Sequence, residues 1–464
     1  MPVRDGRLPG DPARHDPRPR RRRGRLPPGD RRPGRGGRAV TGALDGITVV
    51  EFGQFVSVPF CGQLMADAGA RVIKVEPPGG DSYRSSHELA PGESRQFAIK
   101  NRGKESVALD LGHPDAGEVV RRLAALADVV LVNMSPAAVA RRGLDAATLS
   151  AVNPRLVHGA VTGYGTVGPD AGLPGMDVVV QAHSGLVAAL GAEADGVPRH
   201  SEVQVADYAS SLLLLAGVSM ALVARDRTGR GQPVDVSLLG AALTLQNNQF
   251  SHVDAVDGWR AAFVADELPR LRRAGAGRDR IAAAREAHQP DRLTLTGHYR
   301  VFGTADGAIA VGAGSPPTQE RLAAIAGMPV DRLRTGTEAV RADLAALFVT
   351  RDSAEWVTRL REVAIPCAVV RALDEVLTDP HVEAEGLVAD VEHPAIGRYR
   401  GLGAPIRFGG TPSEPTRPSP PFAAHTTAVL DELGFTPAEA RRLLRSGAAV
   451  ARPRRTDDRS RSSA

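Results

Sequence analysis

The segment ITVVEFGQFVSVPFCGQLMADAGARVIKVE, residues 47–76, decides the fold. It begins with one short apolar run, Ile47–Phe52, and ends with another, Arg71–Glu76, each with the length and composition of a buried strand. Between them, the residues around Phe60–Ala68 have a helical pattern, and Gly69 is a typical residue at which a helix ends. A strand, a helix and a strand in this order predict a parallel βαβ unit.

The same alternation continues along the chain. SVALDL (residues 106–111), DVVLVN (128–133) and RLVHGAVTG (155–163) are further predicted strands. Pro114 opens a predicted helix that runs to about Ala127, and a long apolar helix is expected over Val203–Ala224. Strands alternating with helices predict an α/β fold with a parallel sheet.

The domain organisation follows from changes in this pattern. We expect a large domain over residues 41–230 and a different, smaller module over 235–375, with an Arg/Ala-rich stretch at Leu268–Glu286. A last segment, 380–450, ends in the helix TPAEARRLLRSG, which has a Thr cap and a Gly stop.

Both ends of the chain differ from this body. Residues 1–40 contain thirteen Arg and four Asp, a net charge of +9, with many Pro and Gly and few large apolar residues. Such a segment cannot bury enough surface to offset its chain entropy, so disorder is predicted for it and for the tail, 451–464. The arginines could bind nucleic acid through phosphates, but no aromatic residues interleave with them. A functionless extension, from a start codon placed too early, is the preferred interpretation, and no nucleic-acid partner is expected.

Composition excludes several classes of protein. Two cysteines, Cys61 and Cys367, exclude a disulfide scaffold and a four-cysteine zinc module. The twelve histidines are scattered without metal-ligand spacing, so no metal site is predicted. The longest apolar runs are shorter than the roughly 18–20 residues of a membrane span, so no membrane association is expected. Without a secretory h-region, a cytoplasmic location is expected.

The string GYGTVG (Gly163–Gly168) fits the dinucleotide-binding pattern G-x-G-x-x-G and follows a predicted strand. A nicotinamide site also needs a helix directly after the glycines, whose N-terminus binds the pyrophosphate. The following PDAGLPG breaks a helix at once, so a turn is predicted here.

Two acids have positions that suggest chemistry. Asp177 follows the glycine-rich loop, and Asp207 lies near the start of the long helix, where the helix N-terminus favours an ionised carboxylate. An ionised carboxylate can attack an activated carbonyl. Asp is also a common helix cap, worth about 1 kcal/mol, and the residues alone leave both interpretations open for Asp207. Asp177 is equally open between a loop or cap residue and a functional one.

Nine strings, in order, resemble the class III CoA-transferases, the CaiB/BaiF family. They begin with the segment from Leu44 to Arg84 and continue with KNRGKESVALDL, NPRLVHGAVTGYGTVGP, PGMDVVVQAHSGL, RTGRGQPVDVSLL, IPCAVV, DPHVEAEGLV, HPAIG and HTTAVLDELGF. The resemblance covers about Leu44–Val450. It implies a Rossmann-like large domain built from both chain ends, a smaller central α+β domain, and an interlocked homodimer.

The resemblance also implies a function and a mechanism. Members of the family move CoA between an acyl-CoA and a carboxylic acid, through an acyl-aspartyl anhydride and then an aspartyl-CoA thioester. Their nucleophilic aspartate matches Asp207. CoA is implied as substrate and product, with no tightly bound cofactor. The residues that match the family's CoA contacts are Leu109, Asp110, Leu111, Gly112, Asn133, Met134, Ser135, Arg141, Leu173 and Met176.

Departures from the family pattern limit what carries over. A CoA-contacting arginine of one subgroup is Pro77 here, and that subgroup's active-site glutamine is Val56. Its four-glycine loop has only AGAG (Ala274–Gly277) as a counterpart. These differences argue against an oxalate/formyl-CoA specificity and indicate that CoA is held by other residues.

Two alternatives stay open. An α-methylacyl-CoA racemase of the same fold uses an Asp and a His as two bases on one carbon. Its Asp matches Asp207, but its His is Met176 here, which cannot accept a proton. The other alternative is a non-catalytic protein that binds CoA, or nucleic acid through its Arg-rich head.

Overall fold

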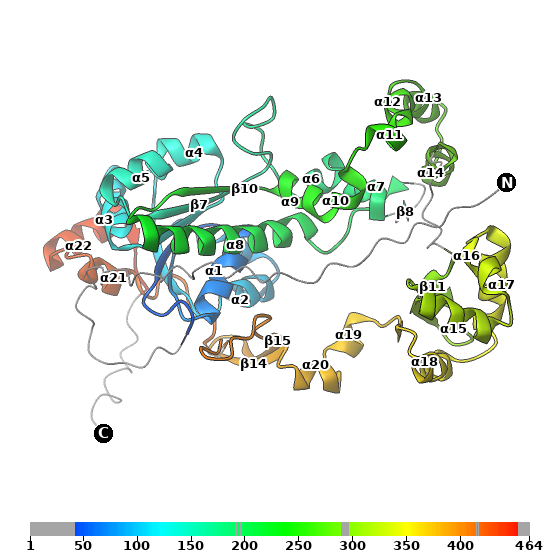
Figure 1. Cartoon of the computed structure of the whole chain (residues 1–464). Coiled ribbons are helices and arrows are strands. Elements are labelled where there is room, and N and C mark those ends of the chain that lie inside the picture. Colours follow the sequence, from blue (N-terminus) through cyan, green and yellow to red (C-terminus); the bar gives the residue numbers. More distant parts are fainter. Residues whose placement is uncertain are drawn as a thin grey trace, which may run out of the picture. The chain divides into compact units, whose positions relative to one another are not determined.

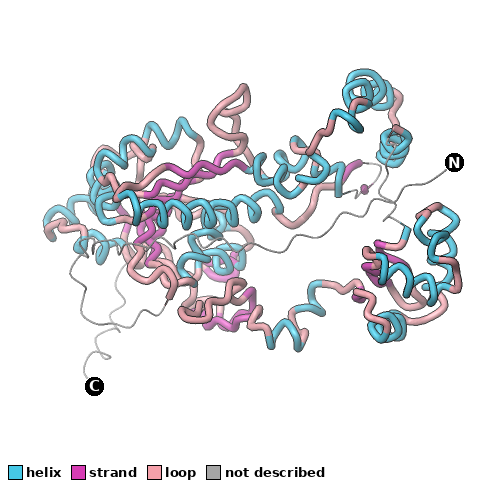
Figure 2. Tube along the Cα trace, in the orientation of Figure 1, coloured by secondary structure: helices cyan, strands magenta, loops and turns pink. Residues whose placement is uncertain are grey.

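The computed structural model describes residues 42–190, 193–194, 197–288, 297–413, 415 and 417–452. The extension expected to be disordered over 1–40, and the tail after Arg452, lie outside the described residues. The main sheet consists of β1 (Thr48–Phe52), β2 (Arg71–Glu76), β5 (Glu105–Leu109), β6 (Val129–Val132), β7 (Val157–Thr162), β10 (Pro233–Ser237) and β16 (Ala449–Val450). Figure 1 shows these elements along the chain, and Figure 2 separates the strands from the helices around them.

The strand order of this sheet is β10-β7-β6-β1-β2-β5-β16, and every neighbouring pair is parallel except β5 and β16. The predicted α/β fold with a parallel sheet is therefore confirmed. The strands β2 and β5, which follow β1 in the chain, lie on one side of it. The later strands β6, β7 and β10 lie on its other side. The order thus reverses between β1 and β6, and ligands of such sheets bind beyond the carboxyl ends of the strands at this reversal.

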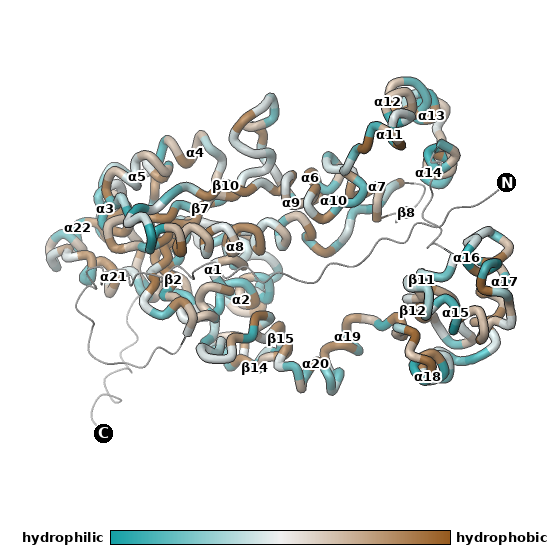
Figure 3. The backbone as a smooth tube through the Cα atoms, viewed as in Figure 1, coloured by the Kyte–Doolittle hydropathy of each residue, from teal (hydrophilic) through white to brown (hydrophobic). Residues whose placement is uncertain are grey.

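Helices cover both faces of the sheet. On one face lie α1 (Ser57–Asp67), α6 (Asp177–His183), α8 (Val205–Thr228) and α9 (Leu238–Leu245), and on the other α3 (Ala116–Leu126), α4 (Pro136–Arg141), α5 (Ala146–Val152), α21 (Thr426–Glu432) and α22 (Pro437–Ser446). Because side chains alternate along a strand, Val49 packs into the first core and Val50 into the second. This double burial explains the continuous apolar strands of the sequence, which are brown in Figure 3.

The C-terminal segment contributes to the same core as the N-terminal strands. Val429 of α21 and Leu443 of α22 pack in the second core, and β16 pairs with β5. Helix α22 begins at a capping box of Thr436 and Glu439 and ends at Gly447, whose φ is +83°. The predicted Thr cap and Gly stop are thus confirmed.

A second sheet has its own core. It contains β11 (Tyr299–Gly303), β12 (Ala308–Gly312) and β13 (Cys367–Val369), with α15 (Pro316–Ala326), α16 (Val330–Arg334), α17 (Glu338–Phe348) and α18 (Ser353–Glu362). Phe302, Phe348 and Trp356 are buried there, in contact through their rings. The division expected near residue 235 falls inside β10, and α9 packs with the large sheet. The predicted domain boundaries stay predictions.

The remaining elements are shorter. They are η1 (Ser82–Ser85), β3 (Glu88–Ala90), β4 (Glu93–Ser94), α2 (Arg95–Asn101), α7 (Leu186–Leu190), β8 (Glu193–Ala194), β9 (Val197–Pro198), α10 (Asn247–Phe250), α11 (Asp254–Asp257), α12 (Trp259–Ala262), the π-helix η2 (Phe263–Glu267), α13 (Leu268–Arg273), α14 (Arg278–Ala287), α19 (Leu373–Val376), α20 (Pro380–Ala384), β14 (Val388–His393) and β15 (Gly397–Leu402).

The long apolar helix expected over Val203–Ala224 is α8, which begins at Val205 and continues to Thr228. Over the described residues it alone is long and apolar enough to cross a membrane, with a mean hydropathy of 1.6. Its buried side chains, among them Leu214 and Val218, pack against the sheet in the first core. A core helix satisfies the same criteria of length and composition, so α8 is weak evidence for a membrane span.

Candidate active site

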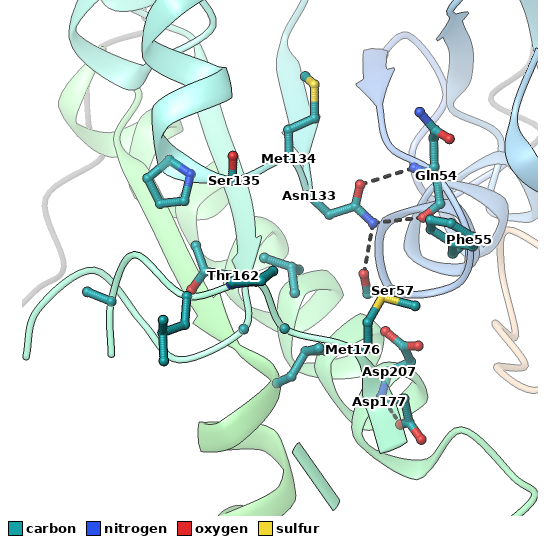
Figure 4. Close-up of a pocket in the computed structure, with 18 residues that line it drawn as sticks. Gln54, Phe55, Ser57, Asn133, Met134, Ser135, Thr162, Met176, Asp177 and Asp207 are labelled. Atoms are coloured by element: carbon teal, nitrogen blue, oxygen red, sulfur yellow. Dashed lines mark hydrogen bonds between the residues drawn. The ribbon is translucent and has the colours of Figure 1, made fainter. Parts of the chain in front are cut away.

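A cavity of about 270 Å³ lies beyond the carboxyl ends of the central strands. Its walls come from the segments that follow β1, β6 and β7, from the loop before α6, and from the first turns of α8 and α9. Of the residues predicted for the site, Asn133, Met134, Ser135, Leu173, Met176 and Asp207 line it. Figure 4 shows the labelled ones around the opening. The cavity therefore lies where the strand order reverses, as the fold requires.

A smaller cavity of about 100 Å³ shares Gln54 and Met134 with the first. Three more predicted residues at the end of β5, Leu109, Asp110 and Leu111, line it together with Pro77. The two remaining predicted residues line neither cavity. The backbone N–H of Gly112 donates to Asp110 Oδ1 at 2.9 Å, and Arg141 is exposed in the last turn of α4.

Asp207 lies in the first turn of α8, as predicted, but it is not the helix cap. The cap comes from Asp177 in the first turn of α6, whose Oδ1 accepts the backbone N–H groups of Ala206 at 2.8 Å and of Asp207 at 3.1 Å. Gln181 donates to the other oxygen of Asp177. The cap interpretation of Asp207 is thus wrong, because a residue 30 positions earlier in the chain takes that role. Asp177 is neither in a loop nor the cap of its own helix, which is Met176; its side chain instead caps α8.

This arrangement leaves the Asp207 carboxylate available for chemistry. It borders the larger cavity, and none of the described residues forms a hydrogen bond with it. Burial and, to a lesser extent, the nearby charge of Asp177 raise the pKa of Asp207 from 3.8 to about 7, and the charge of Lys100 partly opposes this shift. The helix N-terminus favours the ionised form, but burial and a second carboxylate outweigh it. Near neutral pH the carboxylate is in a protonation equilibrium.

Lys100, in α2, is a buried cation near this carboxylate. Only 1% of the residue is exposed, and none of the described carboxylates forms an ion pair with it. Its Nζ donates to Gln96 Oε1 at 2.6 Å and lies 5.1 Å from the ring centre of Tyr83. Burial lowers the pKa of Lys100 to about 8, while the charges of Asp207 and Asp81 oppose that shift.

The loop after β1 brings three side chains that the sequence analysis missed to the cavity: Gln54, Phe55 and Ser57. Phe55 has a φ of +64°, a left-handed conformation that is rare for a bulky residue. Both the oxygen and the nitrogen of the Asn133 side-chain amide form hydrogen bonds with this loop. Its Oδ1 accepts the Gln54 N–H at 3.0 Å, and its Nδ2 donates to the Gln54 carbonyl at 2.8 Å and to Ser57 Oγ at 3.1 Å.

A group of buried charged side chains contacts the beginning of the loop after β1. Lys74 Nζ donates to the Gly53 carbonyl at 2.7 Å and pairs with Glu51 at 3.0 Å and Asp81 at 2.8 Å. Lys104 pairs with the other oxygen of Glu51 at 2.7 Å. All four charged side chains are fully buried, so removing one would leave an uncompensated charge. Through Lys74, this group anchors the start of the loop at Gly53.

The glycine-rich string forms a turn, as predicted. Between this string and Asp177, where α6 begins, the chain forms no helix. Gly163 lines the larger cavity and packs against Gly175, so closely that a Cβ on Gly163 would lie 2.6 Å from the Gly175 Cα. Glycines are needed here for this close backbone approach. No group of three or more His, Cys, Asp or Glu side chains that could hold a metal ion occurs in the described part of the chain.

The functional side chains that were not predicted from the sequence fall into two groups. Gln54, Phe55 and Ser57 directly follow the first strand, so the strand-order reversal could have indicated them. Asp177 as a cap and Lys100 as a neighbouring charge depend on contacts between distant segments, which no local pattern reveals.

Comparison with known proteins adds independent information. Residues 44–426 match CoA-transferase family III. The chain is 32% identical, over 408 residues, to the succinate–glutarate CoA-transferase of Agrobacterium fabrum, which covers 84% of this chain and 95% of the relative. It is 30% identical to the probable fatty acyl-CoA transferase Rv3272 of Mycobacterium tuberculosis. The match covers 83% of this chain and 97% of that relative.

Solved structures agree. The crystal structure of Rv3272 superposes with a TM-score of 0.68 at 29% identity, over 84% of this chain and 99% of that one. A CAIB/BAIF family protein from Brucella suis superposes with a TM-score of 0.66 at 28% identity, over 85% and 100%.

Proposed function

The chain belongs to CoA-transferase family III and moves coenzyme A between an acyl-CoA and a carboxylic acid, and from this premise we propose that Asp207 is its nucleophile. The observation that carries the proposal is the Asp207 carboxylate itself, which faces the larger cavity while Asp177 caps the helix in its place. A carboxylate that is not needed for capping is free to attack a thioester.

The proposed reaction proceeds in balanced steps. One Asp207 oxygen attacks the acyl-CoA carbonyl carbon and expels CoA thiolate, which leaves a mixed anhydride. The thiolate attacks the aspartyl carbonyl, which forms an aspartyl-CoA thioester and releases the donor acid as its carboxylate. The acceptor carboxylate then attacks this thioester and expels the thiolate again. The thiolate finally attacks the acceptor carbonyl of the new anhydride, which yields the product acyl-CoA and regenerates Asp207. No net proton is consumed.

Substrate identity is proposed from the relatives and the cavity size. Relatives with about 28–32% identity are named for succinate, glutarate and succinyl-CoA. A cavity of about 270 Å³ that also receives the thiol end of CoA favours a short acid over a long fatty chain. We propose a succinyl-type donor and a short dicarboxylic acceptor, rather than the fatty acyl group in the name of Rv3272.

A racemase is the second candidate, and the cavity argues against it. That chemistry needs two bases facing one carbon. Met176 lines the cavity where the racemase has histidine, and His183 contacts Tyr164 instead of lining the cavity. The fold and the cavity also favour catalysis over a purely CoA-binding role.

The test is a transfer assay with succinyl-CoA and glutarate, followed by chromatography of both thioesters. Glutaryl-CoA should form with wild type and be lost in Asp207→Asn. Parallel incubation in deuterated water checks the α carbon. Deuterium uptake without transfer would contradict the proposal and favour the racemase. Deleting residues 1–40 should leave transfer unchanged, as expected if the head has no function and no nucleic-acid partner.

We further propose a homodimer in the cytoplasm. The outer face of α8 exposes large apolar side chains, among them Leu212 at 50%, Met220 at 70% and Val223 at 53%. A contiguous apolar face of this kind marks an interface, and a second copy of the chain would cover it. Sedimentation equilibrium should give twice the mass of the chain, and Met220→Glu should weaken the association.

A further inference from the structure

Each acyl transfer in the proposed reaction passes through a tetrahedral oxyanion, and the larger cavity offers that charge no cation. The cavity is lined by the carboxylates of Asp177 and Asp207 and by no basic residue of the described chain. The new negative charge therefore forms next to two acidic residues. It needs a neutral hydrogen-bond donor on the wall that carries Asp207.

Most polar side chains of the cavity are occupied or lie elsewhere. Both hydrogens of the Asn133 amide nitrogen are already donated, to the Gln54 carbonyl and to Ser57 Oγ. The Gln54 side chain points away from the proposed nucleophile in Figure 4. Ser135 and Thr162 lie across the opening from the proposed nucleophile in the same view, whereas Ser57 lies on its side.

Ser57 has an unused donor in the required place. Its Oγ lines the cavity wall beside Asp207 and accepts the Asn133 amide at 3.1 Å. A hydroxyl both donates and accepts, so this bond orients the group and leaves its hydrogen free. None of the described residues accepts that hydrogen. Only 4% of Ser57 is exposed, so bulk water competes little for it.

The position of Ser57 relative to Asp207 is fixed by a shared partner. Ser211 of α8 donates its hydroxyl to the Ser57 carbonyl at 2.6 Å and to the Asp207 carbonyl at 2.9 Å. One side chain thus links the first turn of α1 to the first turn of α8. In addition, the N-cap of α1, Val56, supplies no side-chain hydrogen bond, so the partial positive charge of this helix start favours an anion beside Ser57.

Building on the proposed function, we infer that the Ser57 hydroxyl donates a hydrogen bond to the thioester carbonyl oxygen as Asp207 attacks the adjacent carbon. When the new bond from the Asp207 oxygen forms, the carbonyl π electrons move onto that oxygen, and Ser57 stabilises the oxyanion without giving up its proton. When CoA thiolate leaves, the electrons return to the carbonyl. Ser57 is thus a catalytic residue of the transfer, as neither a nucleophile nor a base.

A single turnover measures this step directly. Wild type and Ser57→Ala are mixed with succinyl-CoA without acceptor and quenched at intervals, and the mass of the Asp207 adduct is followed. Ser57→Ala should form the adduct about 100-fold more slowly, because the lost hydrogen bond is made chiefly in the transition state. Ser210→Ala is the matched control, because its buried hydroxyl bonds to the Asp207 carbonyl and not to the cavity; its rate should stay within about twofold of wild type.

Two further readouts separate this role from a structural one. Ser57→Thr keeps the hydroxyl and should recover part of the rate, whereas Ser57→Cys, nearly the same in shape but a weak donor, should not. With carbonyl-labelled succinyl-CoA bound to the unreactive Asp207→Asn, the infrared stretch of the thioester carbonyl should move to higher frequency when Ser57→Ala is added, because the carbonyl loses its hydrogen bond.

The outcomes that would overturn the inference are distinct. Adduct formation at the wild-type rate in Ser57→Ala or in Ser57→Cys would do so, and the second variant keeps the test open if the first does not fold. A shift in the pH profile of the rate would place the hydroxyl on the Asp207 carboxylate instead of the substrate. Absence of an Asp207 adduct in wild type would overturn the proposed function, whereas a normal adduct that forms independently of Ser57 would overturn only this inference.

Discussion

The Oδ1 atom of Asp177, in α6, accepts the backbone N–H of Asp207, in the first turn of α8, at 3.1 Å. The Asp177 carboxylate therefore caps α8, and the Asp207 carboxylate faces the cavity. The proximity has an electrostatic cost, because each negative charge disfavours the other. Stability, pH dependence and reactivity of the site are linked through this pair.

Asp207→Asn should stabilise the protein above neutral pH. The pKa of Asp207 rises from 3.8 to about 7 on folding, so between these values the folded chain holds a proton that the unfolded chain releases. Stability from this group is full below pH 3.8 and is lost as the pH rises through 7. Denaturant titrations at pH 8 should show the variant more stable by about 2 kcal/mol, and the difference should vanish near pH 4. Asp226→Asn, an exposed change on the same helix, is the control; an equal gain there would contradict the account.

Lys100→Met should move the pH profile of kcat/KM to higher pH. The nucleophile acts as the carboxylate, so wild-type activity should rise through pH 7, the approximate pKa of Asp207. Lys100 favours the ionised form, and its loss should raise that pKa by about half a unit to one unit. Lys100→Arg keeps the charge and should restore the profile. A profile that stays in place while activity falls would show that Lys100 has only a structural role.

Asp177→Asn should shift the same profile in the opposite direction. The change removes a negative charge next to Asp207 but retains an oxygen that can accept the N–H groups of Ala206 and Asp207. The pKa that governs the acid limb of the profile should fall by about half a unit to one unit. Asp177→Ala, which also removes the cap, should in addition cost about 1 kcal/mol of stability. An upward shift in Asp177→Asn would be inconsistent with like-charge repulsion at this site.

Much of this arrangement was predictable because it is local. The strands at Thr48–Phe52 and Arg71–Glu76 have apolar runs that are buried on both faces, and the order of motifs identified the family correctly. CoA transfer between acids, expected from that resemblance, is confirmed. The position of Asp207 in the first turn of a long helix is also confirmed.

The rest depends on contacts that sequence order hides. Asp177 reaches α8 from another helix, and Lys100 acts on Asp207 from α2. In an isolated helix pattern Asp207 has the features of a cap, because nothing local reveals that a distant carboxylate has taken the position. Which residues contact CoA stays a prediction.

Asn133→Ala should loosen the loop after β1. The change removes three hydrogen bonds that hold Gln54 and Ser57, and with them the support for the left-handed Phe55. We expect a loss of about 2 kcal/mol in the free energy of unfolding and a lower kcat at saturating acyl-CoA. Ser135→Ala removes only a helix-cap bond of 3.3 Å from the same wall and should cost less than about 1 kcal/mol. Equal effects of the two variants would contradict the positioning role of Asn133.

The measurement that tests the central claim most directly is the intact mass of the enzyme after brief incubation with succinyl-CoA and no acceptor. The account predicts a covalent adduct with the added mass of CoA or of the acyl group, mapped by peptide analysis to Asp207. The adduct should disappear with hydroxylamine and be absent in Asp207→Asn. Transfer that proceeds at the wild-type rate in Asp207→Asn, or an adduct that maps to another residue, would contradict it.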